Sequence, residues 1–233
     1  MGKNKVARWA EMKSFGNVIE PHIDDIRESS HELKGKWKKS VFNNNHPLVL
    51  ELGCGKGEYT VGLAAKFPEK NFIGLDIKGA RIWRGAKTAR ENQYSNVLFL
   101  RTRIEFINSF FAEDEADEIW ITFPDPFPRQ RDEGRRLTSP QFLNLYRRFL
   151  RNRGIVHLKT DNRQLYQYTL GLAEKNVMDI ITSTDDLYSG LIENDILSIR
   201  THYENLFLKE GKKINYLSFC LEKNIEIGNE GRK

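Results

Sequence analysis

Asp125 is an acidic residue held between prolines, in a segment that reads Phe-Pro-Asp-Pro-Phe-Pro-Arg over residues 123–129. Each proline fixes its own φ and pushes the preceding residue toward extended conformations, so the chain around Asp125 has few options. A stiff acidic loop at the end of an apolar run suits the orientation of a polar, planar ring. The segment therefore predicts a loop that presents Asp125 to a ligand.

The residues that follow this loop are strongly basic. Eight arginines and two acids fall between Arg129 and Arg153, which gives a local net charge of +6 where the whole chain carries +5. Such a stretch suits contact with a polyanion. A surface loop followed by a solvated, charged helix would have the same composition, so other parts of the chain must decide.

A second candidate binding element lies upstream, where an apolar run from Leu48 ends in glycines at alternate positions. These are Gly53, Gly55 and Gly57. Glycine tolerates positive φ and lets the backbone approach a ligand, and residues 58–67 read as a helix. We therefore expect a strand, a tight turn and a helix, with a cofactor over the turn.

Two classes of coenzyme compete for such a turn. A dinucleotide fingerprint needs its third glycine at position 58, which is Glu58 in this chain. The observed pattern is E-x-G-x-G-x-G, with Glu51 just before the glycines. It disfavours a nicotinamide coenzyme, and it resembles the first motif of class I S-adenosylmethionine-dependent methyltransferases.

Asp76 ends the next predicted strand, residues 71–77, about 20 positions after the last glycine. A carboxylate at this place can accept hydrogen bonds from both hydroxyl groups of a ribose. NAD enzymes use the same device, so Asp76 alone does not separate the two coenzymes. The alternative is that Asp76 caps a helix that starts near Gly79.

Strands and helices alternate along the chain. We expect seven strands, near residues 48–52, 71–77, 97–100, 118–123, 154–160, 178–181 and 214–221. The clearest helix runs from Ser139 to about Asn152. This order predicts an α/β fold with a doubly wound, mostly parallel seven-stranded sheet.

Ligands of such sheets bind beyond the carboxyl ends of the strands. Four acids stand at these ends in the predicted fold, and we expect them to converge on one cleft. They are Glu51, Asp76, Asp125 and Asp161.

Length and composition fit one catalytic domain over residues 45–223, preceded by a basic extension over 1–44 and followed by a tail over 224–233. We expect the extension to be partly helical or flexible. Cys54 and Cys220 are too few for a disulfide framework and lack metal-ligand spacing, so no metal is expected. No signal peptide or membrane-spanning run is visible, which favours a cytoplasmic protein. Both a monomer and a homodimer stay open.

Basic residues with interspersed tryptophans form two clusters before the first strand. They are Lys3, Lys5, Arg8, Trp9 and Lys13, and then Lys34, Lys36, Trp37, Lys38 and Lys39. Such clusters bind phosphates without reading sequence, and a tryptophan can stack on an exposed base. Taken alone, a basic run is more often a solvated face.

Four motifs together resemble the bacterial tRNA (guanine-N7-)-methyltransferase family: E-L-G-C-G-K-G, F-P-D-P-F-P-R-Q-R, K-T-D-N and T-H-Y-E. The resemblance covers roughly residues 45–222. It implies a Rossmann-like class I fold, S-adenosylmethionine as methyl donor and tRNA as partner, with guanosine 46 of the variable loop as the target.

The resemblance also implies a role for individual residues. The implied cofactor contacts are Glu51, Gly53, Gly55, Gly57, Asp76, Arg103 and Asp125. The implied substrate contacts are Arg129, Asp161, Thr201, His202, Tyr203 and Glu204. Asp125 is the residue shared between cofactor and target base, and it is the implied catalytic residue.

The chain departs from the family pattern at three positions. Phe127 replaces the usual tryptophan and Arg129 the usual lysine, and both replacements keep the stacking surface and the positive charge. Arg103 stands where the family usually has an acid or an amide near the adenine. Recognition of the adenine is then expected to use backbone groups.

The chemistry needs no general base, because guanine N7 already carries an in-plane lone pair. Positioning of N7 and negative charge near the guanine, supplied by Asp125, would be enough. Two alternatives stay open: a methyltransferase for another nucleobase amine, since D-P-F-P loosely resembles the D-P-P-Y loop, and a non-catalytic RNA-binding protein.

Overall fold

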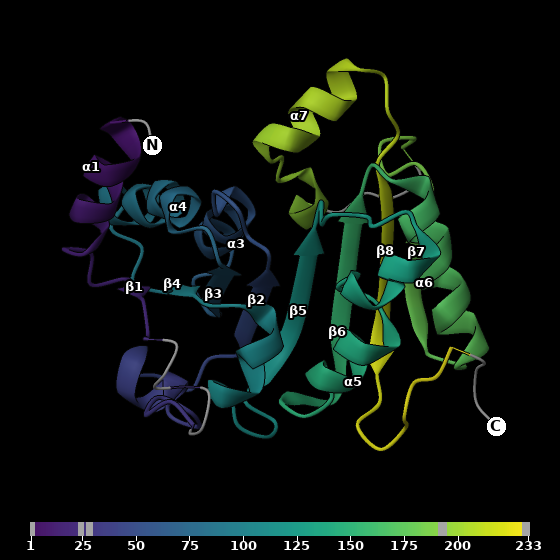
Figure 1. The fold of residues 1–233 in the computed structure, drawn as a ribbon, viewed down its shortest axis with the longest axis horizontal. Helices are drawn as coiled ribbons and strands as arrows, with labels where there is room; N and C mark the ends of the chain where they lie inside the picture. Colours follow the sequence, from purple (N-terminus) through teal and green to yellow (C-terminus); the bar gives the residue numbers. More distant parts are fainter. Residues whose placement is uncertain (1–2, 23–25, 27–29, 191–194, 230–233) are drawn as a thin grey trace. The chain divides into compact units, whose positions relative to one another are not determined.

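The computed structural model describes residues 3–22, 26, 30–190 and 195–229 (Figure 1). The chain divides into two compact units, Met1–Ala112 and Glu113–Lys233, which we call unit 1 and unit 2.

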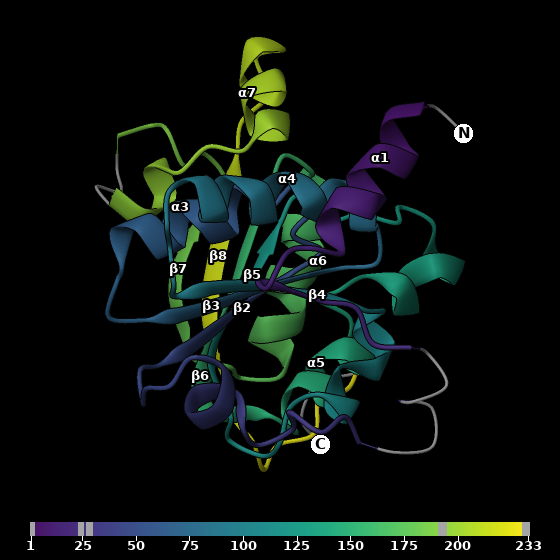
Figure 2. The same ribbon diagram turned by 90° about the vertical axis from the view of Figure 1, so that its left-hand side faces the viewer.

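Unit 1 contains four of the described strands and the described helices that precede the Asp125 segment. Its elements are α1 (Lys3–Met12), β1 (Val18–Ile19), the π-helical turn η1 (Trp37–Val41), β2 (Leu48–Leu52), α3 (Glu58–Lys66), β3 (Asn71–Asp76), α4 (Gly79–Glu91), β4 (Val97–Arg101) and the 3₁₀ turn η2 (Ile104–Ser109). The strands lie in the order β1-β4-β3-β2 and all pair in parallel. Both views show α3 and α4 together on one side of these strands (Figures 1 and 2).

The packing of unit 1 explains two of its glycines. A Cβ on Gly57 would lie 2.4 Å from the Phe99 ring, and one on Gly85 would lie 2.7 Å from the Lys56 carbonyl oxygen. The start of α3 and the middle of α4 can therefore approach each other over Phe99 only because neither position carries a side chain.

Trp37 belongs to the core of unit 1. Its side chain is fully buried, its Nε1 donates to the Phe110 carbonyl at 2.8 Å, and its ring stacks on Phe111 at 5.3 Å. The prediction that Trp37 stacks on an RNA base is wrong, because its ring is buried against Phe111 and its N–H already donates to a backbone carbonyl.

The N-terminal helix α1 is docked on α4 (Figure 2). Met12 is buried, and Glu11 accepts hydrogen bonds from Trp83 Nε1 at 2.8 Å and from Lys87 Nζ at 2.9 Å. These bonds lower the pKa of Glu11, with the Lys87 bond as the largest cause and the Trp83 bond next. The first helix of the basic extension is therefore part of the folded unit.

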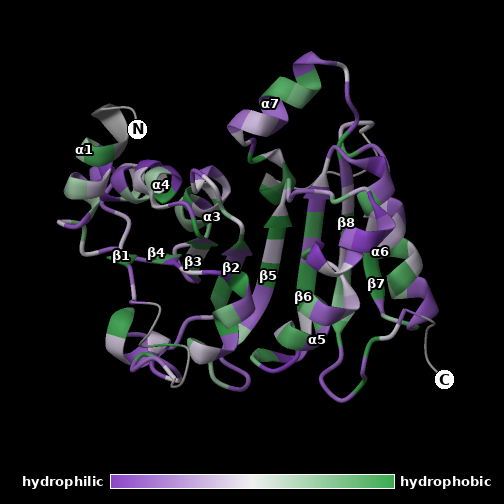
Figure 3. Cartoon of the chain, in the orientation of Figure 1, coloured by the Kyte–Doolittle hydropathy of each residue, from purple (hydrophilic) through white to green (hydrophobic). Residues whose placement is uncertain are grey.

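Unit 2 holds the other four strands. Its elements are β5 (Ala116–Thr122), the 3₁₀ turn η3 (Gln130–Arg135), α5 (Pro140–Tyr146), β6 (Leu150–Thr160), α6 (Arg163–Lys175), β7 (Ile180–Thr184), the 3₁₀ turn η4 (Asp195–Ser198), α7 (His202–Lys209) and β8 (Asn215–Leu221). The strands lie in the order β5-β6-β8-β7, with β5 and β6 parallel and the other two pairings antiparallel. Figure 3 shows hydrophilic residues along α4 and α6, with hydrophobic residues concentrated in the strands.

The structure confirms the α/β class with mostly parallel strands, but the described residues form eight strands instead of the predicted seven. The additional strand is β1, whose two residues pair with Phe99 and Leu100 of β4. Two residues are too few to show a hydrophobic period, so the sequence gives no signal for this strand.

The predicted helix from Ser139 to Asn152 is too long. The helix α5 ends at Tyr146, and β6 begins at Leu150. The guanidinium of Arg147 donates to the carbonyl oxygens of Glu222 and Lys223, which fixes the chain just after the helix. A tertiary contact therefore ends the helix where the local pattern would continue it.

Candidate active site

The glycine turn after β2 has the conformation that its sequence predicts. Gly53, Gly55 and Gly57 have φ values of +75°, +57° and +67°, which is the left-handed region that favours glycine. A Cβ on Gly55 would meet nothing within 4 Å, whereas Gly57 is closed in by Phe99. Gly55 is therefore the position in the turn where a ligand has room to approach the backbone.

Asp76 holds this turn in place from the end of β3. Its Oδ2 accepts a hydrogen bond from Gly55 N at 2.9 Å, and its Oδ1 accepts one from Lys78 N at 2.7 Å. The carboxylate is 8% exposed and has no cationic partner in the described part of the chain. The N-cap of α4 is Lys78, so Asp76 does not take the capping role that was the alternative.

Glu51 lies in the interior of unit 1, at 2% exposure. Its Oε2 accepts hydrogen bonds from the backbone N–H of Thr60, at 2.8 Å, and from the Thr60 hydroxyl. Glu51 therefore ties β2 to the first turn of α3, directly behind the glycines.

The pKa of the Cys54 thiol reflects the charges around the turn. Burial raises the pKa of the Cys54 thiol well above its usual range, and the negative charges of Glu51 and Asp76 raise it further. The thiol stays protonated, and the turn has a negative potential that suits a cationic ligand.

Arg103 follows β4 and is half-exposed. Its guanidinium pairs with Glu105 at 3.1 Å and lies 6.0 Å from the Phe106 ring. Its assignment as a cofactor contact stays a prediction.

The loop that carries Asp125 lies in unit 2, directly after β5. Phe123 and Phe127, which both precede prolines, have φ values of +49° and +42°. The expectation that residues before proline are extended is wrong at these two positions. Bulky residues with positive φ are strained, so neighbouring structure must hold them there.

Two arginines from the basic stretch hold this loop. Arg136 donates to the Phe127 carbonyl from Nε at 3.1 Å and from Nη2 at 3.0 Å, and Arg135 lies 4.3 Å over the Phe127 ring. Arg136 also stacks on Tyr168 at 4.2 Å, whose hydroxyl donates to Glu133 at 2.9 Å. Part of the arginine cluster therefore stabilises the protein itself, in addition to any role toward a ligand.

Asp125 is exposed at the tip of the held loop. In the described part of the chain its carboxylate has no hydrogen bond or ion pair, and the same is true of the exposed Arg129 side chain four positions later. The loop is fixed by its neighbours while the acid that it presents stays available.

Asp161 follows β6 and pairs with Lys212 at 3.2 Å. The Lys212 ammonium also lies 4.4 Å over the ring of Phe207, on α7, and Phe207 contacts Phe123 at 5.8 Å. The end of β6, the helix α7 and the start of the Asp125 loop are therefore joined within unit 2.

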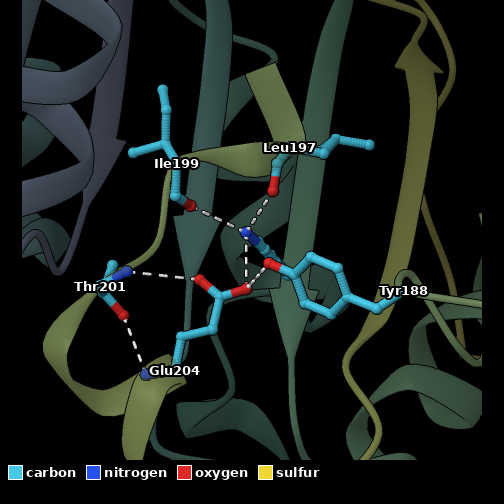
Figure 4. A network of polar contacts seen from close by, with 6 residues as sticks. Tyr188, Leu197, Ile199, Thr201 and Glu204 are labelled. Carbon is cyan, nitrogen blue, oxygen red and sulfur yellow. Dashed lines mark hydrogen bonds and ion pairs between the residues drawn. The ribbon is translucent and has the colours of Figure 1, made fainter. Parts of the chain in front are cut away.

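The T-H-Y-E motif begins α7, and two of its residues form a capping box. Thr201 Oγ1 accepts from Glu204 N at 3.2 Å, and Glu204 Oε2 accepts from Thr201 N at 3.3 Å (Figure 4). Glu204 is fully buried, whereas His202 and Tyr203 are exposed. The motif thus divides into two residues that brace the helix and two that it presents to solvent.

A buried lysine completes this brace. Lys159 Nζ pairs with Glu204 Oε1 at 2.8 Å and donates to the carbonyl oxygens of Leu197 at 2.9 Å and Ile199 at 3.0 Å (Figure 4). Tyr188 donates its hydroxyl to the same Glu204 oxygen at 2.6 Å. Burial lowers the pKa of Lys159, and the charge of Glu204 opposes that shift.

Sequence reasoning missed Lys159 and Tyr188. The available signal for Lys159 was a cation among the apolar residues Ile155, Val156 and Leu158 of β6, because a fully buried lysine needs an acid partner. The structure brings the predicted residues together as two groups. Glu51, Asp76 and the glycines lie in unit 1, and the other group, around Asp125, Asp161 and α7, lies in unit 2. The convergence of the two groups on one cleft stays a prediction.

Comparison with known proteins decides the family. A family model described as putative methyltransferase matches residues 45–217. The tRNA (guanine-N(7)-)-methyltransferase of Christiangramia forsetii is 50% identical over 94% of this chain and 99% of its own length. The corresponding protein of Porphyromonas gingivalis is 55% identical over 90% of this chain and 86% of its own length.

The chain belongs to the tRNA (guanine-N7-)-methyltransferase family. This confirms the resemblance drawn from the four motifs and the assignment as an enzyme. Solved structures share the fold of this methyltransferase at low identity. The 16S rRNA methyltransferase KamB has a TM-score of 0.61 at 13% identity, over 83% of this chain and 95% of its own. A 30S ribosomal A1408 methyltransferase from an uncultured bacterium has a TM-score of 0.58 at 15% identity, over 82% and 97%.

Two features are absent from the described residues of this methyltransferase. None of the helices there is long and apolar enough to cross a membrane. The same residues contain no group of three or more His, Cys, Asp or Glu side chains that could hold a metal ion.

Proposed function

We propose that the protein transfers a methyl group from S-adenosylmethionine to N7 of a guanosine in tRNA, and that this guanosine is position 46 of the variable loop. The observation that carries the proposal is that Asp125 is exposed, has no partner among the described residues, and lies on a loop that arginines hold in a strained conformation. Family membership supports the reaction class, and relatives at 50% and 55% identity are named for guanine N7 of tRNA.

The residues of unit 1 fit the proposed methyl donor. Gly55 leaves open space over the turn, and Asp76 is an almost buried carboxylate whose two known partners are neutral backbone N–H groups. Each carboxylate oxygen can accept a further hydrogen bond, so Asp76 can also bind ribose hydroxyls. When bound, S-adenosylmethionine supplies a methyl group on a positively charged sulfonium, and the negative potential at Cys54 favours that charge.

The residues of unit 2 fit the target base. N7 of guanine attacks through its own lone pair, so Asp125 removes no proton from the reacting atom. Its carboxylate accepts from the guanine N1–H or the exocyclic amine, which selects guanine and places negative charge beside the base as it becomes cationic. The rigid loop keeps this charge in position without reorganisation during transfer.

We assign the remaining substrate contacts to the exposed groups near this loop. Arg129 can bind a phosphate bidentately, and His202 and Tyr203 offer rings on which a splayed base can stack. Asp161 can contact the nucleotide through Oδ1, because the bond to Lys212 uses Oδ2. Thr201 and Glu204 act on the substrate through the position of α7, since Glu204 is fully buried.

The decisive test is incubation of the protein with radiolabelled S-adenosylmethionine and unmodified tRNA, followed by mapping of the labelled nucleoside. We expect 7-methylguanosine at position 46, and no label in a matched transcript that carries adenosine there. Label on an exocyclic amine would support the alternative acceptor, and absence of label would support the non-catalytic reading.

A further inference from the structure

The surface formed by α1 and α4 of unit 1 is strongly basic. Its members are exposed cations on these two helices or directly beside them, and we call them the α1–α4 basic face. They are Arg8, Lys13, Lys78, Arg81, Arg84 and Arg90.

None of these six cations forms an ion pair in the described part of the chain, although Arg90 lies within electrostatic range of Glu11. Lys87 of α4 differs from them, because its Nζ forms an ion pair with Glu11 Oε1 of α1 at 2.9 Å. Arg8 lies 4.7 Å over the Trp83 ring and Arg90 lies 4.4 Å over the Phe15 ring. Such contacts orient a guanidinium but leave its charge uncompensated.

The charges on α4 do not serve the stability of the helix. Lys78, Arg81 and Arg84 follow one another at three-residue intervals, so they share one side of the helix, where like charges repel. Lys78 at the N-cap and Arg81 in the first turn also lie at the positive end of the helix dipole, which disfavours cations. Two independent unfavourable terms at one helix end indicate an external anion.

We propose that the α1–α4 basic face binds the phosphate backbone of tRNA. The inference rests on the proposed function and extends it to a surface of unit 1 outside the donor turn. Arginine forks match phosphate geometry, and contacts of this kind position an RNA without reading its bases. Because Lys78 is two residues from Asp76, a phosphate backbone held on this face would lie beside the donor turn.

The test compares two charge reversals of equal size within unit 1. Arg81→Glu combined with Arg84→Glu alters the basic face. Lys66→Glu combined with Lys70→Glu alters two cations of unit 1 outside both basic clusters, one at the C-terminal end of α3 and one just before β3. Filter binding measures the affinity for unmodified tRNA at several salt concentrations, and calorimetry measures the affinity for S-adenosylmethionine.

We expect the face variant to raise the Kd for tRNA about tenfold or more and to reduce the log-log salt slope by roughly 1.4 to 1.8, the value for two lost phosphate contacts. The control should change the Kd less than about twofold, and donor affinity should stay the same in both. Arg81→Ala with Arg84→Ala repeats the test if the charge reversal impairs folding.

Equal losses in the two charge reversals would show a general effect of net charge and would overturn the proposal, as would a wild-type slope in the face variants. Loss of binding to phosphatidylserine vesicles without loss of tRNA binding would assign the face to a membrane and overturn it as well. The proposed function is judged separately. If tRNA binding depends on the face while no methyl reaches N7, the inference stands and the proposed function fails.

Discussion

The candidate site residues of this protein differ most in whether their polar groups already form hydrogen bonds or ion pairs within the fold. Glu51 and Glu204 are buried and bonded to backbone or buried partners, whereas Asp125 is exposed and has no such partner in the described ranges. The sequence alone predicts all three as site residues, because residue type and spacing do not show where a carboxylate points. Burial separates the acid that can meet a ligand directly from those that position other groups.

Replacement of Asp125 by Asn keeps the size of the side chain and removes its charge. We expect the single-turnover rate of methyl transfer to fall by an amount that corresponds to about 2 to 4 kcal/mol, with donor affinity retained. Glu174→Gln, which removes an exposed and unpaired carboxylate on α6, is the control and should react at the wild-type rate. An unchanged rate for Asp125→Asn would reduce Asp125 to a residue that orders its loop.

Asp76→Ala should weaken donor binding more than the loss of one small side chain would by itself. It removes the proposed acceptor for the ribose and also frees Gly55 N from its bond at 2.9 Å. An unsatisfied pair of hydroxyl groups costs on the order of 1 to 3 kcal/mol, so calorimetry should show a rise of about fivefold to 150-fold in the Kd for S-adenosylmethionine. Wild-type affinity would contradict the placement of the donor.

At the scale of elements, the Asp125 loop and α7 are both held by interactions that act from outside them. Arg136 grips the Phe127 carbonyl, and Lys159 of β6 holds Glu204 at the start of α7. The motifs made both elements visible in the sequence. The conformations of the chain could not be predicted in the same way. The positive φ of Phe123 and Phe127 and the early end of α5 depend on partners distant in sequence.

Lys159→Met should destabilise the protein by about 3 to 5 kcal/mol, because it leaves Glu204 buried and charged without its cation. Adding Glu204→Gln should recover part of the loss. Urea denaturation measures both variants, and Lys175→Met, at an exposed and unpaired lysine of α6, controls for the loss of a lysine. Strictly additive losses in the double variant would mean that the two charges do not interact.

At the scale of the whole molecule, the proposed donor contacts belong to unit 1 and the proposed base contacts to unit 2. The alternation of strands and helices predicted the α/β class and seven of the eight strands. It did not predict the two-residue strand β1. Composition alone also did not distinguish arginines that stabilise the fold from cations that form no ion pair.

Hydrogen exchange should separate these roles across the chain. We expect S-adenosylmethionine to slow exchange mainly around residues 53–60 and 76–79. Unmodified tRNA should slow it around the Asp125 loop, the start of α7 and the N-terminal part of α4. A donor footprint confined to unit 2 would contradict the assignment of the donor to the glycine turn.

Both cysteines of the chain are free and buried, and the pKa of each thiol is raised, chiefly by burial. Thiol reagents attack the thiolate, so Cys54 and Cys220 should react slowly while the protein is folded. A cysteine introduced by Lys209→Cys, at an exposed position of α7, could therefore carry a fluorophore without prior removal of the native thiols. The protein could therefore be labelled at one chosen position without further cysteine substitutions. The fluorescence of a label on α7 would then report the binding of RNA.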